Sequence, residues 1–205
     1  MLMTNEMAIG NMQKPTEYAL VGDGVDDYLN TNYGNGIDLN VDDITVEIEI
    51  EFLNVGTTGD IQDIYWGEVG TGDNNRIYLG IYEGYFSLGI ANLLHTNNKS
   101  NKAVQINKNY LIKIDFNNSG YDLYINEDLV MQNSYTPFIT SANFYLLNAN
   151  GTGVRSNAQI FSYRVILNNT VVQSLDMNEG SGANVKDYVG SNDATIVGAT
   201  WQEVD

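Results

Sequence analysis

The stretch ITVEIEIEFLN, residues 44–54, decides the fold, because apolar and acidic side chains alternate along it. The apolar set is Val46, Ile48, Ile50 and Phe52, and the acidic set is Glu47, Glu49 and Glu51. Successive side chains of a β-strand point to opposite faces of the sheet, so this pattern predicts a strand with one face in a core. The acidic face is then either a catalytic row or a surface in contact with water or a ligand.

Short segments with the same alternation recur from residue 17 onward, separated by clusters of Gly, Asn and Asp. No segment shows the period of a helix. Segments of this kind, rich in Tyr, Ile and Val and spaced by about 8 to 12 residues, predict an all-β fold in which two antiparallel sheets pack as a sandwich. The ranges predicted as strands are 17–22, 44–53, 63–69, 75–82, 85–91, 102–107, 110–116, 121–126, 129–133, 143–148, 159–167 and 170–177.

The composition excludes several classes of function. The chain has 205 residues, with 9 basic against 26 acidic side chains, and its net charge of −17 repels nucleic acids and anionic lipid surfaces. It has no cysteine, so disulfides and thiolate metal sites are excluded. No segment is apolar over the length that membrane insertion requires. We therefore expect neither a nucleic-acid partner nor insertion into a membrane.

The first 16 residues differ from the rest of the chain. They carry Met1, Met3, Met7 and Met12 ahead of Pro15, and they lack the basic start and apolar run of a secretion signal. Methionine side chains adapt to irregular partner surfaces. We expect residues 1–16 to be an arm, either flexible or docking and able to link copies into a homo-oligomer, ahead of one domain at 17–205.

Several motifs resemble those of the laminin-G-like and concanavalin A-like jelly rolls, a group of lectin, glucanase and adhesion domains. The closing motif often precedes the opening strand in that family, and a permuted order requires only that the two chain ends lie side by side. The resembling motifs are YALVGDGVDDYLNT (18–31), ITVEIEIEF (44–52), NYLIKIDFNNSGYDLYINEDLV (109–130), SYRVIL (162–167) and DMNEGSGANVKDYVGSNDATIVGATW (176–201). In the third motif Glu127 stands where the family's turn usually has glycine.

This resemblance implies a jelly-roll fold and, because such domains occur in bacteriophage tails and fibres, a virion component. The implied function is that of a non-enzymatic structural or adhesion module that binds a glycan or other virion proteins. Its location would be the virion, after assembly in the host cytoplasm. A purely architectural protein anchored by the N-terminal arm is an alternative.

A second alternative is a glycoside hydrolase. Some glucanases of this fold carry a Glu-x-Asp-x-Glu strand, and the resemblance would make Glu47 the nucleophile and Glu51 the acid and base, with Glu49 in place of the aspartate. The outer Cα atoms lie roughly 13 Å apart at about 3.3 Å per residue. A retaining pair needs carboxyl groups about 5 to 5.5 Å apart. The spacing therefore favours a solvated or ligand-facing strand over a catalytic row.

Two further groups of residues are candidate sites. Aromatic side chains can stack on sugars, and the candidates are Tyr65, Trp66, Tyr78 and Tyr82. Asp23, Asp26 and Asp27 can offer oxygen ligands to calcium, although their spacing is not that of a recognised calcium loop. Aspartates of tight turns also bond the nearby backbone, which favours a structural role. No other cofactor is expected.

Overall fold

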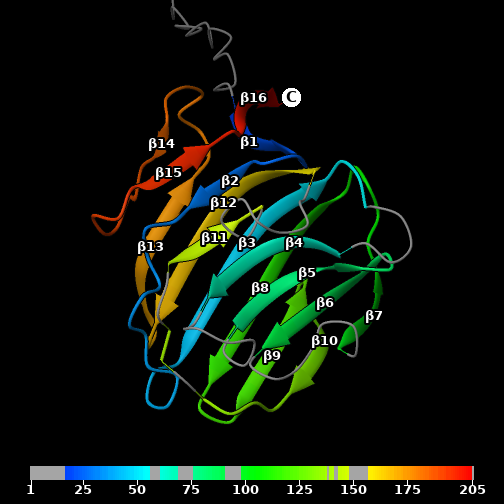
Figure 1. Cartoon of the computed structure of the whole chain (residues 1–205), viewed down its shortest axis with the longest axis vertical. Coiled ribbons are helices and arrows are strands. Elements are labelled where there is room, and N and C mark those ends of the chain that lie inside the picture. The colour runs from blue at the N-terminus through cyan, green and yellow to red at the C-terminus, as the bar shows by residue number, and fades with distance from the viewer. Residues whose placement is uncertain are drawn as a thin grey trace, which may run out of the picture.

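The computed structural model describes residues 17–55, 61–68, 76–90, 98–137, 139–140, 143–147 and 157–204, which form sixteen strands in two facing sheets (Figure 1). Within these ranges there is no helix, and so none long and apolar enough to cross a membrane. The predicted all-β sandwich of antiparallel sheets is confirmed. The arm at residues 1–16 lies outside the described ranges.

The strand with alternating apolar and acidic residues, β3 (Ile44–Phe52), lies near the centre of the first sheet, sheet A. Its order is β10-β9-β8-β3-β12-β1-β16, and β13 also pairs with β12. The strands of sheet A are β1 (Glu17–Asp23), β3 (Ile44–Phe52), β8 (Asn109–Asn117), β9 (Gly120–Ile125), β10 (Asp128–Asn133), β12 (Asn157–Leu167), β13 (Thr170–Asp176) and β16 (Thr200–Val204).

Sheet B faces the inner side of sheet A, and its order is β14-β15-β2-β11-β4-β5-β6-β7. Its strands are β2 (Tyr28–Asn30), β4 (Ile61–Glu68), β5 (Arg76–Tyr82), β6 (Tyr85–Ile90), β7 (Lys99–Ala103), β11 (Phe144–Leu146), β14 (Asn184–Val185) and β15 (Ala194–Val197).

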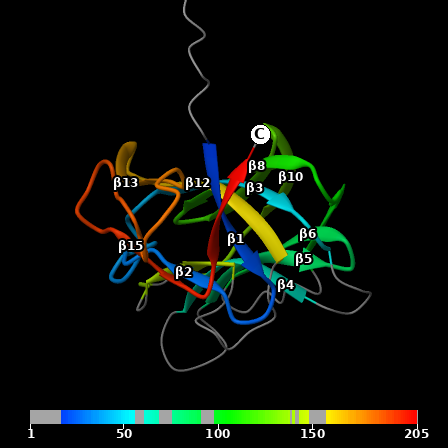
Figure 2. The ribbon, with the colours of Figure 1, turned by 90° about the horizontal axis from the view of Figure 1, so that it is seen from above.

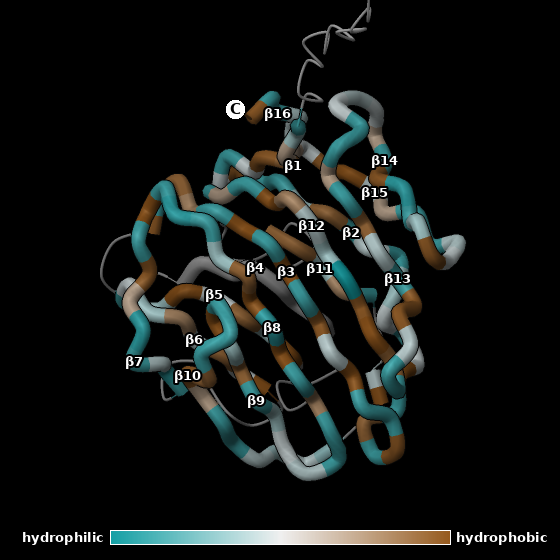
Figure 3. The backbone as a smooth tube through the Cα atoms, turned by 180° about the vertical axis from the view of Figure 1, so that it is seen from behind, coloured by the Kyte–Doolittle hydropathy of each residue, from teal (hydrophilic) through white to brown (hydrophobic). Residues whose placement is uncertain are grey.

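The inner face of β3 supplies the centre of the core. Val46, Ile48, Ile50 and Phe52 are all 0% exposed. Burying each such side chain stabilises the fold by about 1.5–3 kcal/mol. Alternating polar and apolar positions are visible along β3, β8 and β12 when sheet A is seen from behind (Figure 3). The period of two therefore leaves the glutamates of β3 on the outer face of sheet A.

Three aromatic rings join the two sheets. Phe52 of β3 and Tyr110 of β8 meet Phe86 of β6, with ring centroids 6.1 and 5.2 Å from that of Phe86. Both contacts are edge-to-face, the geometry that aromatic pairs favour. These rings hold β3 and β8 against sheet B and so fix the position of the outer glutamates.

The two ends of the chain are neighbours in sheet A. β1 pairs antiparallel with β16, in a register that places Leu20 opposite Trp201 and Val21 opposite Thr200. Figures 1 and 2 show the two strands together at the top of the sandwich. The closing motif therefore lies beside the opening strand, as a permuted order requires.

Asp187 holds the closing motif in place. Its carboxylate accepts hydrogen bonds from the backbone N–H groups of Ser174, Val189, Gly190 and Asn192, at 3.0–3.2 Å. Burial raises the pKa of Asp187, but the backbone donors outweigh this effect, so its net pKa is lowered. The aspartate of the family-like Asp-x-x-Gly element is thus structural in this protein.

Some strands differ from the sequence predictions. The strand expected at 102–107 is instead β7, which ends at Ala103, because Asn107 takes a φ of 54° and donates its N–H to the Phe52 carbonyl at 2.8 Å. Ile106 consequently lies in a turn and is 52% exposed. The sequence does not predict the short strands β2, β14, β15 and β16. Three of them, β2, β15 and β16, pair with strands that are distant in sequence, and β14 has only two residues.

The turn between β9 and β10 carries a strained glutamate. Asn126 and Glu127 have φ values of 51° and 70°, and two consecutive positive φ values define the hairpin turn in which glycine is favoured at the second position. We expect Glu127→Gly to raise the free energy of unfolding by roughly 0.5–1 kcal/mol, measured by urea denaturation.

Glu127→Ala is the matched control, because it removes the same carboxylate but keeps Cβ. It should leave the free energy of unfolding unchanged. An equal gain in both variants would assign the effect to charge and contradict the account of backbone strain.

Candidate functional site

The glutamates of β3 are bonded to neighbouring strands to different degrees. Glu47 forms an ion pair with Arg164 of β12 at 3.3 Å. Glu49 accepts a hydrogen bond from Asn109 of β8 at 2.8 Å and a longer one from Ser162 of β12 at 3.4 Å. Glu51 makes no hydrogen bond or ion pair with any residue that the structure describes.

The row of glutamates opens into two separate depressions. Glu49 and Glu51 line a groove of about 490 Å³ toward the chain ends. Glu47 lines a different depression of about 310 Å³, together with Arg164 and Asp176. A glycosidase presents its two carboxyl groups to one glycosidic bond. The separation of Glu47 from Glu51 therefore disfavours the glycoside hydrolase hypothesis.

We call the larger depression the glutamate groove. It crosses the outer face of sheet A from β8 through β3, β12 and β1 to β16, and it combines carboxylates and amides with one aromatic ring. Its lining residues are Glu17, Glu49, Glu51, Asn109, Gln159, Phe161, Gln202, Glu203 and Val204.

Gln159 is the least ordinary member of this groove. Its side chain stands on the outer face of β12, opposite Glu51 of β3 and Val21 of β1, and only 8% of the residue is exposed. Across the described ranges, its side-chain amide has no hydrogen-bond partner. Among the described residues, the fully buried side-chain atoms without a hydrogen bond do not include those of Gln159, so its amide is open to the groove. An unpartnered amide at a groove wall is suited to bind a polar ligand.

Phe161 adds an aromatic ring to the groove. It follows Ile160, which is 0% exposed, so alternation along β12 places Phe161 on the outer face with Gln159. The register between β12 and β3 shifts between Ile160 and Ser162, so Phe161 has no partner position on β3. The groove thus has an aromatic surface among its polar groups.

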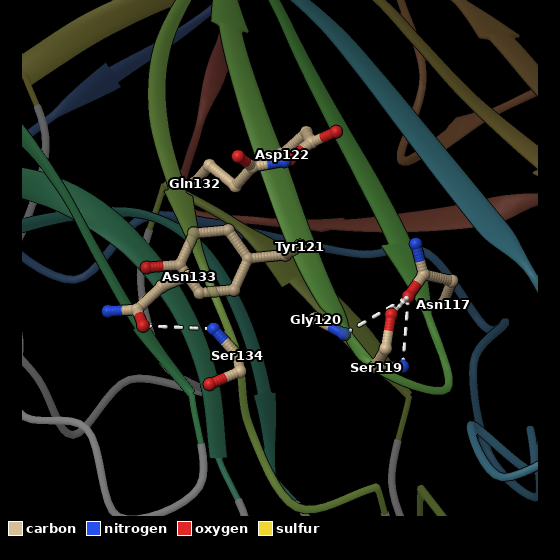
Figure 4. A pocket seen from close by; sticks show the side chains of 8 residues that line it. All are labelled: Asn117, Ser119, Gly120, Tyr121, Asp122, Gln132, Asn133 and Ser134. Carbon is tan, nitrogen blue, oxygen red and sulfur yellow. Dashed lines mark hydrogen bonds between the residues drawn. The ribbon is translucent and has the colours of Figure 1, made fainter.

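Another pocket, the hairpin pocket, lies at the end of the β8–β9 hairpin. Polar groups in it form hydrogen bonds with one another (Figure 4). The Asn117 Oδ1 atom accepts hydrogen bonds from the N–H groups of Ser119 and Gly120, at 2.9 and 3.0 Å. The Gln132 amide donates to Asp122 at 2.7 Å. Because these contacts close turns and pair neighbouring strands, the pocket offers fewer unused groups than the glutamate groove.

The aromatic residues singled out in the sequence do not line the glutamate groove. Tyr65 and Trp66 belong to β4 of sheet B, and their side chains lie outside the described residues. Tyr78 is 6% exposed, and its ring fills the space beside Gly89, so it offers no surface to a sugar. Tyr82 is half-buried, with the Lys99 amine 5.8 Å from its ring centroid.

The structure does bring together the three aspartates predicted for calcium. One carboxylate oxygen from each of Asp23, Asp26 and Asp27 lies within 4.8 Å of the others. Asp27 is 7% exposed and accepts the Asp23 N–H at 2.7 Å, while Asp23 accepts the Val25 N–H at 2.6 Å. Hard oxygen donors of this kind fit calcium, which takes six to eight of them. The same atoms close the turn, and calcium binding stays a prediction.

The fold is similar to three solved structures that are distant in sequence. Mouse laminin α1 chain domains LG4-5 give a TM-score of 0.56 at 12% identity, over 88% of this chain and 46% of that one. The CBM40 domain of the Ruminococcus gnavus IT-sialidase, bound to α2,3 sialyllactose, gives 0.53 at 15% identity, over 77% and 92%. The Trypanosoma rangeli sialidase in complex with sialic acid gives 0.51 at 14%, over 75% and 26%.

At these identities the similarity establishes the fold, which is a concanavalin A-like jelly roll. The chain spans less than half of the laminin fragment and about a quarter of the sialidase. No protein-family model matches the sequence, and no curated protein is similar to it in sequence.

The aspartate cluster makes stability depend on pH. Burial and the neighbouring carboxylates raise the pKa of Asp27 above its ordinary value, so ionising it costs more in the folded protein than in the unfolded chain. With a chelator at pH 7, Asp27→Asn should therefore raise the melting temperature. This gain should vanish as the pH falls through the pKa of folded Asp27 toward the unfolded value of about 3.9, because the wild-type carboxyl is then protonated in both states.

If the aspartate cluster binds calcium, added calcium should make the melting temperature of the wild type higher than that of Asp27→Asn. The melting temperature of the wild type would rise with added calcium, and that of Asp27→Asn would not. A wild-type melting temperature that calcium leaves unchanged would reject the calcium site and retain the turn-closing role.

Proposed function

We propose that this protein is a non-catalytic module that binds a glycan in the glutamate groove. The observation that carries the proposal is Gln159, a residue 8% exposed whose side-chain amide opens to the groove without a partner among the described residues, between carboxylates and a phenyl ring. Amides and carboxylates bond sugar hydroxyls as donors and acceptors, and an aromatic ring stacks on the apolar face of a sugar. The groove offers all three kinds of contact.

The size and fold of the CBM40 domain support the proposal. That domain, whose structure holds α2,3 sialyllactose, is covered over 92% of its length by this chain. Sialyllactose is an anionic sugar, whereas the glutamate groove is lined by carboxylates, and the whole chain has a net charge of −17. Electrostatic repulsion makes an anionic glycan a poor ligand here. We therefore expect the ligand to be neutral or positively charged.

The absence of catalysis is part of the same proposal. Glu47 is paired with Arg164 and lies in a different depression from Glu51, so the two carboxyl groups do not flank a common bond. The virion role stays a prediction from the sequence resemblance. Assembly through the N-terminal arm also stays a prediction.

The test is the variant Gln159→Met on a panel of neutral and amine-bearing oligosaccharides. Methionine has a similar length and no amide, so the variant loses the hydrogen bonds to the ligand and keeps the packing of the side chain. For the glycan of the panel that binds the wild type, we expect the affinity of the variant to be roughly tenfold weaker, since one lost hydrogen bond lowers the binding free energy by about 1–1.5 kcal/mol. The melting temperature should stay the same or rise. Calorimetry measures both quantities.

Gln132→Met is the matched control, because Gln132 lies in the hairpin pocket of the same sheet. It should leave glycan binding unchanged. The proposal fails if no glycan of the panel binds. It also fails if the protein hydrolyses a glycan that it binds. Equal binding by wild type and Gln159→Met would also move the site away from the groove.

A further inference from the structure

The glutamate groove carries negative charge from two strands that are distant in sequence. Its outward-facing carboxylates are Glu17 of β1 and Glu49 and Glu51 of β3. The lining of the groove includes no lysine or arginine. Glu49 and Glu51 form no ion pair with any residue of the described ranges. The groove therefore holds carboxylates that the protein itself does not neutralise.

The basic residues nearest to the groove in sequence and register are engaged elsewhere. Arg164 is paired with Glu47, and Lys113 is paired with Asp115 at 2.7 Å. Lys108, which precedes Asn109, donates to the Gln105 side chain at 3.3 Å and stands 5.6 Å from the ring centroid of Tyr110. None of these three cations lines the groove. Positive charge must come from a ligand.

The spacing of the carboxylates distinguishes an extended ligand from a metal ion. Among the described residues, the carboxylate oxygens of Asp23, Asp26 and Asp27 gather within 4.8 Å of one another. No three carboxylates that the structure describes in the groove converge in this way. A hard cation needs such convergence. Carboxylates spread along a groove are instead suited to a chain molecule that carries several positive charges.

We propose that the groove is selective for glycans with free amino groups, such as oligomers of glucosamine. This inference rests on the proposed function and names its ligand class. Protonated amines would pair with Glu49 and Glu51, while the unpartnered amide of Gln159 bonds the sugar hydroxyls and Phe161 contacts the sugar ring. A polycation without sugar rings would make no use of the contacts that Gln159 and Phe161 offer, so these two residues distinguish an amino sugar from a simple polycation.

The test compares two tetrasaccharides of equal length, the glucosamine tetramer with free amines and its fully N-acetylated form. The measurement is calorimetry on the full chain near pH 5.5. We expect the amine form to bind roughly tenfold more tightly, since it can form exposed ion pairs that the acetylated form lacks. The preference should shrink with added salt, because salt screens exposed charges.

Glu49→Gln combined with Glu51→Gln should abolish the preference for the amine form, so that both tetramers bind the variant with equal affinity. Glu127→Gln is the matched control, because Glu127 is an exposed glutamate in the β9–β10 turn, outside the groove. It should leave the preference intact. A loss of the preference in the control would assign it to net charge and overturn the inference.

Two other outcomes overturn the inference. If the acetylated tetramer binds as tightly as the amine form, the amine preference is wrong and glycan binding stands. If tetralysine binds as tightly as the amine form, and Gln159→Met binds it unchanged, the groove recognises charge without the sugar. If neither tetramer binds, the amine preference is also overturned, and the wider glycan panel then decides the proposed function separately.

Discussion

Burial of one face of β3 is the constraint on which the rest of the structure depends. Four apolar side chains of this strand are 0% exposed, and rings from β3 and β8 interlock with Phe86 of the facing sheet. Because strand side chains alternate, burial of that face forces the three glutamates outward as a row. A shift of one residue in the pairing of β3 would place carboxylates in the core, so the register and the position of the acidic row are fixed together.

The row becomes a groove only where the ends of the chain meet. β1 and β16 pair at one side of sheet A and bring Glu17 and Gln202 to the same face as Glu49 and Glu51. Gln159 of β12 lies between these two groups of strands, and Phe161 on the same face of β12 adds an apolar surface. The chemistry of the site thus results from the topology of the sandwich, and no continuous motif encodes it.

This division explains what the sequence could predict. Periodicity reveals β3 and the β8–β9 hairpin because their patterns are local and strong, and the aspartate cluster lies within five consecutive residues. The strands β14, β15 and β16 have two to five residues each and at most one buried residue, so alternation gives little signal for them. Gln159 and Phe161 could not be identified, because the burial of the former and the groove around both depend on neighbours that lie more than a hundred residues away. The isolated glutamate row suggested a catalytic motif because its neighbours were unknown.

The side-chain amide resonances of Gln159 give the most direct test of the central claim, that the unpartnered amide on the outer face of sheet A is a ligand group. In a ¹⁵N-labelled sample titrated with the glycan that binds best, the account predicts that these resonances shift most among the Gln and Asn side chains. Smaller shifts should follow at Asn109 and Gln202, which line the same groove. The largest shifts at Asn117, Gln132 and Asn133 of the hairpin pocket, with Gln159 unchanged, would contradict it.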